Sequence, residues 1–367
     1  MKKNLARGIG AFDGIKGISL LLVVWVHAVS HLVERFPEQE LALFFSFLRR
    51  RMGFVLAIFF IITGYTWKKS AIGNCIKKQA KVLLKPYLIV AIFGMAGIMA
   101  YTVLFTPGDV FFEQVAGQLA GYCLGISESF FWNDFQIMHT GAAWFLVALF
   151  FGGNLLNIIF NLTENERLRH GIVIGTVIVG MCSTIWPVAP FCYSQALLVV
   201  GYLYVGYLLN ESRFFEKKMG KCFWFLCATV FITTLIWGKT GMSKNQWKLG
   251  LYDYLGTITG ALCVLKWYFS YFKNNSKIGE KLSYIGRNSL WVLCVHAVEM
   301  RIAWWFIIRQ IIEKIIPLWN CLALDFLLQY VIDWTIILAA VALIDKFIKK
   351  QKRKKALKRR TEGVKSA

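Results

Sequence analysis

The feature of this sequence that most constrains its fold is a series of apolar runs, each close to the length of a helix that crosses a lipid bilayer. The runs lie at 17–34, 53–67, 86–105, 141–160, 171–186, 190–209, 222–238, 250–272, 288–308 and 321–346. Apolar and aromatic residues make up 57% of the chain and charged residues 17%, which argues against a soluble or disordered protein. The pattern predicts an all-α, polytopic membrane helix bundle with about ten transmembrane helices.

The net charge of +22 lies mostly between these runs. If the N-terminus is cytoplasmic, 31 of the 42 Lys and Arg residues fall in the cytoplasmic segments 1–16, 68–85, 161–170, 210–221, 273–287 and 346–367. The positive-inside rule therefore places both termini in the cytoplasm. We expect one transmembrane domain over 1–348 and a basic cytoplasmic tail over 349–367. The tail sequence KKQKRKKALKRR is more typical of binding to anionic membrane lipids than to nucleic acid.

Two segments depart from this simple pattern. The basic cluster Arg49–Arg51 falls on the outer side against the positive-inside rule, which favours a re-entrant or interfacial segment there. Segment 109–126 has apolar residues at helical spacing beside Glu113 and Gln114. That mixture predicts an interfacial helix in the long outer loop better than it predicts a crossing.

Ionisable side chains at membrane depth are costly, so they mark the first places to look for chemistry. They are Lys16, His27, Asp253, Lys266, His296, Glu299, Asp325 and Asp333. Lys16 and His27 are eleven residues apart, which on a helix puts them on one face and about 16 Å apart. Spacing alone favours an ordinary interpretation, in which Lys16 reaches the headgroups and His27 bonds between helices. His27 and His31 have the spacing of a metal pair without an evident third ligand, so we expect no metal.

Four sequence motifs favour a functional interpretation of Lys16 and His27 over this ordinary one. The stretch FDGIKGISLLLVVWVHAVSHL, which holds Lys16 and His27, is followed by FFIITGYTW at 59–67, GAAWFLVALF at 141–150 and YIGRNSLWVLCVHAV at 284–298. In order and spacing they resemble the acyltransferase-3 family, membrane proteins that transfer acyl groups, usually acetyl, from coenzyme A to extracytoplasmic sugars. Lys16 stands where the family more commonly has Arg, and Thr63 stands where it often has Ser.

The resemblance implies a plasma-membrane O-acetyltransferase that moves an acetyl or other acyl group from cytoplasmic acyl-CoA to a hydroxyl of a cell-surface or envelope glycan. His27 would accept the proton of the acceptor hydroxyl, or would itself be transiently acylated. Lys16 would assist at the reacting group and, with Lys85 and Arg287 near other cytoplasmic helix ends, would bind the phosphates of acetyl-CoA.

Four more residues are candidates for substrate contact. Tyr65 and Trp144 are predicted to line the acceptor or acyl channel, although aromatic side chains at such depth usually serve in packing. Asp253 is a candidate for binding sugar hydroxyls, with an exposed loop-edge carboxylate as the simpler interpretation. Asp333 lies eight residues after Asp325 and on nearly the same helix face, which predicts a polar pocket or an ion pair with Lys266 or an arginine.

Two other functions are compatible with the same pattern. Intramembrane charges and about ten helices are equally natural in a transporter or flippase, although broken helices at symmetry-related positions are not evident. A non-catalytic sensor would use the same intramembrane pocket to hold a small ligand. We rank both below the acyltransferase.

Overall fold

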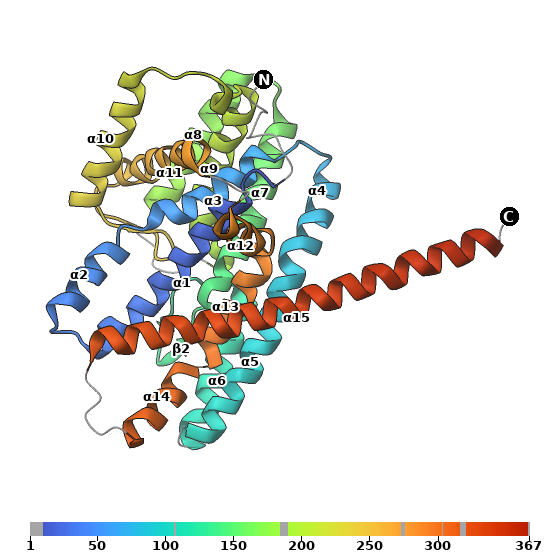
Figure 1. Ribbon diagram of the computed structural model, residues 1–367. Coiled ribbons are helices and arrows are strands. Elements are labelled where there is room, and N and C mark those ends of the chain that lie inside the picture. The colour runs from blue at the N-terminus through green and yellow to red at the C-terminus, as the bar shows by residue number, and fades with distance from the viewer. Residues whose placement is uncertain are drawn as a thin grey trace.

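The computed structural model describes residues 10–105, 108–183, 190–272, 276–302, 304–315 and 321–365, and these are overwhelmingly helical (Figure 1). Two short antiparallel hairpins interrupt the helices: β1 (Phe130–Trp132) pairs with β2 (Phe135–Ile137), and β3 (Thr240–Gly241) pairs with β4 (Gln246–Trp247). The prediction of an all-α bundle is confirmed.

The helices follow one another with short connections. The first half contains α1 (Asp13–Arg35), α2 (Glu40–Arg49), α3 (Gly53–Tyr65), α4 (Ile72–Gln79), the π-helical turn η2 (Ala80–Leu84), α5 (Lys85–Phe105), α6 (Gly108–Leu124), η3 (Gly141–Ala143), α7 (Trp144–Leu162) and α8 (Glu166–Cys182). The second half contains η5 (Pro190–Cys192), α9 (Tyr193–Glu211), η6 (Phe214–Glu216), α10 (Lys221–Trp237), α11 (Leu251–Tyr271), α12 (Lys277–Arg287), α13 (Ser289–Ile302), α14 (Trp304–Ile315) and α15 (Leu322–Lys365).

Every predicted crossing falls on a helix, but the crossings are less uniform than the sequence suggests. Five stretches in the described part of the chain are long and apolar enough to span a membrane: Asp13–Arg35, Ile72–Leu104, Gly141–Leu162, Pro190–Glu211 and Leu322–Gln351. The predicted run 53–67 forms only the 13-residue α3, about 20 Å long. The predicted run 288–308 is divided between α13 and α14. Residues 184–186 and 303 of the predicted runs lie outside the described residues.

The short helix α3 is largely buried among its neighbours. A methyl group at Gly64 would collide with the carbonyl oxygen of Leu203 in α9, and one at Gly206 would collide with the carbonyl oxygen of Ile61. The two glycines therefore let α3 and α9 approach backbone to backbone. The hydroxyl of Thr63 donates within α3 to the carbonyl of Phe59 at 2.8 Å.

The basic cluster Arg49–Arg51 follows the short helix α2, which lies at the edge of the bundle (Figure 1). The Arg51 guanidinium donates to the carbonyl oxygens of Leu235 and Ile236 at the end of α10. Helix C-termini leave carbonyls unpaired and attract positive charge. Arg51 therefore caps that helix end, whereas Arg49 donates to the hydroxyl of Ser30 in α1.

Segment 109–126 forms α6, which runs antiparallel to α5 as a helical hairpin (Figure 1). The hydroxyl of Tyr87, near the start of α5, donates to the carbonyl of Tyr122, near the end of α6, at 2.6 Å. The helix is confirmed, and α5 is the surface it covers.

At the C-terminus, α15 continues without a break across the predicted boundary at 348/349 and projects from the bundle (Figure 1). The basic residues therefore extend the last apolar helix.

The contact between α3 and α9 yields a prediction about stability. We expect Gly64→Ala to destabilise the protein by about 1–3 kcal/mol, because the added methyl group forces the two backbones apart. Gly175→Ala, on an open face of α8, is the matched control and should be neutral or slightly stabilising. Thermal unfolding of both variants in detergent is the measurement. Equal melting temperatures would contradict the close-approach argument.

Candidate active site

A cavity of about 1240 Å³ opens at the predicted cytoplasmic end of the bundle. Asp13, Lys16, Leu20 and Val23 contribute one face of α1 to its lining, at spacings of three or four residues. Val23 is one helical turn before His27, which extends the same face. The remaining walls come mainly from α3, α7 and α13, with Phe59, Ile62, Phe145, Leu149, Leu290 and Leu293 among the lining residues. The cavity thus leads along α1 from Lys16 towards His27.

The mouth of this cavity is basic. Lys16, Lys68, Lys78 and Arg213 are among its lining residues. Lys16 also forms an ion pair with Asp13, with 2.8 Å between Nζ and Oδ1. The four cations outnumber the two lining carboxylates, Asp13 and Glu211, so the charge at the predicted cytoplasmic entrance favours negatively charged groups.

Two residues predicted to join this entrance, Lys85 and Arg287, are exposed and lie outside the cavity lining. Lys85 is seven residues after Lys78, which on a regular helix would give the two the same face. The π-helical turn η2 lies between them and shifts the register by one residue, so Lys85 turns away. Arg287 ends α12, and the amide of the adjacent Asn288 donates to the carbonyl of Tyr284 at 3.0 Å.

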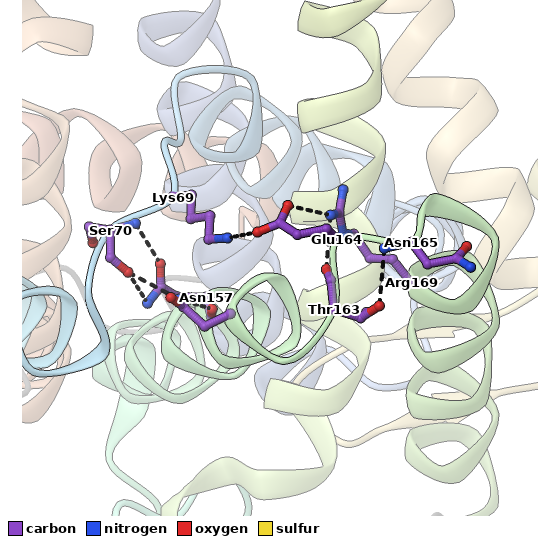
Figure 2. A network of polar contacts seen from close by, with 8 residues as sticks. Lys69, Ser70, Asn157, Thr163, Glu164, Asn165 and Arg169 are labelled. Atoms are coloured by element: carbon purple, nitrogen blue, oxygen red, sulfur yellow. Dashed lines mark hydrogen bonds and ion pairs between the residues drawn. The ribbon is translucent and has the colours of Figure 1, made fainter.

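A network at the rim holds the segment that carries Lys68 (Figure 2). The buried amide of Asn157 accepts from the backbone N–H of Ser70 at 3.0 Å and donates to its carbonyl at 2.9 Å. Beside it, the Lys69 ammonium donates to Glu164, whose other carboxylate oxygen is 3.7 Å from Arg169. The hydrogen bond from Lys69 lowers the pKa of Glu164, which therefore stays ionised at neutral pH. These contacts tie the rim to α7 and α8.

Beyond the inner end of the cavity, His27 of α1 meets His296 of α13, with ring centroids 5.2 Å apart. His27 is half-buried, whereas His296 is 2% exposed. Nδ1 of His296 is 3.2 Å from Oε2 of Glu299, one turn later on α13. The Glu299 carboxyl shares a hydrogen bond with buried Asp333 of α15. The structure thus brings together four residues that the sequence singled out separately.

A second, partly buried polar cluster was not predicted. Nη2 of Arg301 lies 2.8 Å from Nδ1 of His139, and the backbone N–H of Gly141 donates to the same nitrogen at 3.0 Å. Burial and the Arg301 charge lower the pKa of His139 to about 3, so its imidazole is neutral. Because Nδ1 accepts from these donors, the ring proton resides on Nε2. His139 falls in an outer loop of the predicted topology, so a search for charges within apolar runs passes over it.

The structure places the other predicted substrate residues in different surroundings. Tyr65 lines the cavity and stacks edge-on against Phe12, whereas Trp144 is buried outside the lining. Asp253 is fully buried, so the interpretation as an exposed loop-edge carboxylate is wrong. Its carboxylate accepts from the backbone N–H groups of Lys239 and Leu249 at 3.2 and 2.8 Å and fixes the β3–β4 loop.

Asp325 and Lys266 also have identified neighbours. Asp325 is 3.8 Å from Arg35 and 4.0 Å from Arg309, as expected for pairing with arginine. The Lys266 ammonium instead lies 5.6 Å from the centre of the Trp224 ring. His31 contacts Glu34 at 3.7 Å, and the described part of the chain holds no cluster of three or more metal-ligating side chains.

The structure thus combines an apolar helix bundle, a cavity whose lining carries four cations, and a histidine pair beyond it, which are features of a multi-pass membrane protein with a polar interior site. The sequence profile of the acyltransferase-3 family, described as an acyltransferase domain, matches residues 9–344. The chain belongs to this family and is a membrane acyltransferase. No curated protein and no solved structure matches it.

The cavity predicts a difference in reactivity among three buried cysteines. Cys75, Cys192 and Cys294 are 6%, 0% and 5% exposed, but only Cys75 of these lines the cavity. We expect a small thiol reagent to modify Cys75 at least about tenfold faster than the other two, because access limits the reaction of buried thiols. Mass spectrometry of the native, labelled protein gives the three rates. Similar rates would show that the cavity does not admit small molecules.

Proposed function

We propose that this membrane acyltransferase moves an acetyl group from acetyl-CoA, entering from the cytoplasm, to a hydroxyl of a glycan at the cell envelope. The observation that supports this most directly is the path along α1, where one helix face runs from Lys16 at the basic entrance through the cavity to the turn before His27. The family membership supports acyl transfer, and the basic entrance supports a phosphate-bearing donor.

The reaction requires a base that can accept the proton of the acceptor hydroxyl while that hydroxyl lies next to the thioester. The acceptor oxygen attacks the thioester carbonyl carbon while His27 accepts the hydroxyl proton. The carbon–sulfur bond then breaks, and His27 returns that proton to the coenzyme A sulfur, so the transfer consumes and releases no net proton. Transient acylation of His27, followed by attack of the acceptor, gives the same products in two steps.

The donor fits the cavity in size and in charge. A volume of about 1240 Å³ exceeds that of most small-molecule pockets, as a long nucleotide thioester requires. Lys16, Lys68, Lys78 and Arg213 would meet the phosphates, and the apolar walls beyond them suit the narrow pantetheine arm. A cytoplasmic donor would then serve an outer acceptor without being transported itself.

The role of His27 is tested by substitution. We expect His27→Ala to lower transfer of radiolabelled acetyl from acetyl-CoA to envelope glycan by about 10³-fold, because the general base is lost. His170→Ala, at the exposed start of α8, is the control and should retain activity. Undiminished transfer by folded His27→Ala protein would remove the proposed base. Counterflow of unmodified glycan in liposomes without acetyl-CoA would support a transporter instead.

The basic entrance is tested with two lysines on the same continuous helix. We expect Lys78→Met to raise the KM for acetyl-CoA about tenfold, because a charge-assisted phosphate contact is lost. Lys85→Met, which removes an equal charge outside the cavity, should leave KM within about twofold. Initial rates over a range of acetyl-CoA concentrations give both constants. An equal effect of the two substitutions would indicate general surface charge rather than a site.

A further inference from the structure

The two ring nitrogens of His296 have very different surroundings. Nδ1 is 3.2 Å from the Glu299 carboxylate, whereas Nε2 is buried and has no hydrogen-bond partner among the described residues. A buried polar atom left unpaired is costly, and in native proteins it commonly has a functional explanation. The side chain that His296 faces, with ring centroids 5.2 Å apart, is His27.

Two carboxyl groups lie behind the Nδ1 side of His296 and bear on which of its nitrogens carries the proton. Glu299 and Asp333 share a side-chain hydrogen bond, and because ionised carboxylates only accept, the pair must hold a proton. With that proton on Asp333, the Asp333 carboxyl donates to Glu299. Glu299 then keeps the negative charge and accepts from Nδ1 of His296.

We propose that Glu299 and Asp333 are positioning residues that keep the His296 proton on Nδ1, so that Nε2 offers its lone pair to His27. This inference rests on the proposed function of His27 as the base. It assigns to the carboxyl pair a role in the transfer reaction, in addition to stabilising the helix contact between α13 and α15.

The distance between the His27 and His296 rings allows a hydrogen bond between them during the reaction. Centroids 5.2 Å apart allow facing imidazole nitrogens to reach hydrogen-bond length after a small rotation of His27, and such contacts often close only when substrate binds. One nitrogen of His27 then donates to Nε2 of His296, which leaves its other nitrogen as the acceptor for the glycan hydroxyl proton. The negative charge on Glu299 stabilises the imidazolium that forms on His27.

Carboxyl-to-amide substitutions test this role. We expect Glu299→Gln and Asp333→Asn to lower kcat by about 10²- to 10⁴-fold, because the orienting charge or its supporting proton is lost. The KM for acetyl-CoA should stay within about twofold, because neither residue lines the cavity. Glu34→Gln, whose carboxylate pairs with His31, and Asp345→Asn, whose carboxylate pairs with Lys349 on α15, are the matched controls. Unchanged kcat in folded Glu299→Gln protein would overturn the proposal.

The tautomer itself can be measured without relying on activity. The chain has five histidines, so ¹⁵N-histidine labelling gives few signals, and His296→Gln identifies the relevant pair. We expect the Nδ1–H tautomer of His296 in the unmodified protein and its loss in Glu299→Gln but not in Glu34→Gln. An Nε2–H tautomer or a doubly protonated ring in the unmodified protein would overturn the proposal even if Glu299→Gln does not fold. If acetyl transfer were absent altogether, the proposed function would fail while the tautomer result stood independently.

Discussion

The cost of keeping ionisable side chains inside an apolar helix bundle determines much of this structure. Asp325 is matched by Arg35 and Arg309, Arg301 by His139, and Asp253 by two backbone N–H groups. Each of these contacts joins segments far apart in the sequence and so fixes how the helices are aligned. His27 differs from these residues, because no described residue makes a hydrogen bond with its ring, which lies beside the His296 ring with centroids 5.2 Å apart.

The cavity depends on a second constraint, the close approach of helices around it. The contact of Gly64 with Leu203 draws α3 against α9, while α1 crosses α12 where Gly17 meets the backbone of Leu282. These contacts bring the backbones of the paired helices close together. The cavity lies between α1, α3, α7 and α13. The rim network of Lys69, Ser70, Asn157, Glu164 and Arg169 then keeps the entrance in place.

The sequence predicts the helices well because apolar runs of this length have few other stable forms in a membrane. It also predicts that Lys16 and the turn before His27 share a face, since that follows from helical period alone. It does not predict contacts that depend on how helices cross. The pairing of His139 with Arg301 spans 162 positions, and the burial of Asp253 depends on a hairpin loop that folds over it. Trp144 belongs to a recognisable motif, yet its side chain packs beside the path instead of lining it.

The π-helical turn between α4 and α5 changes which side chains of the continuous apolar stretch Ile72–Leu104 share a face. One extra residue in a turn advances the angular phase of everything after it by about 100°. A single helical wheel drawn for this stretch therefore mixes two surfaces, one belonging to the cavity and one to the outer side of the bundle. Deleting one residue within η2 would bring the two wheels into phase, and the lipid-facing side chains of α5 would then be turned inward.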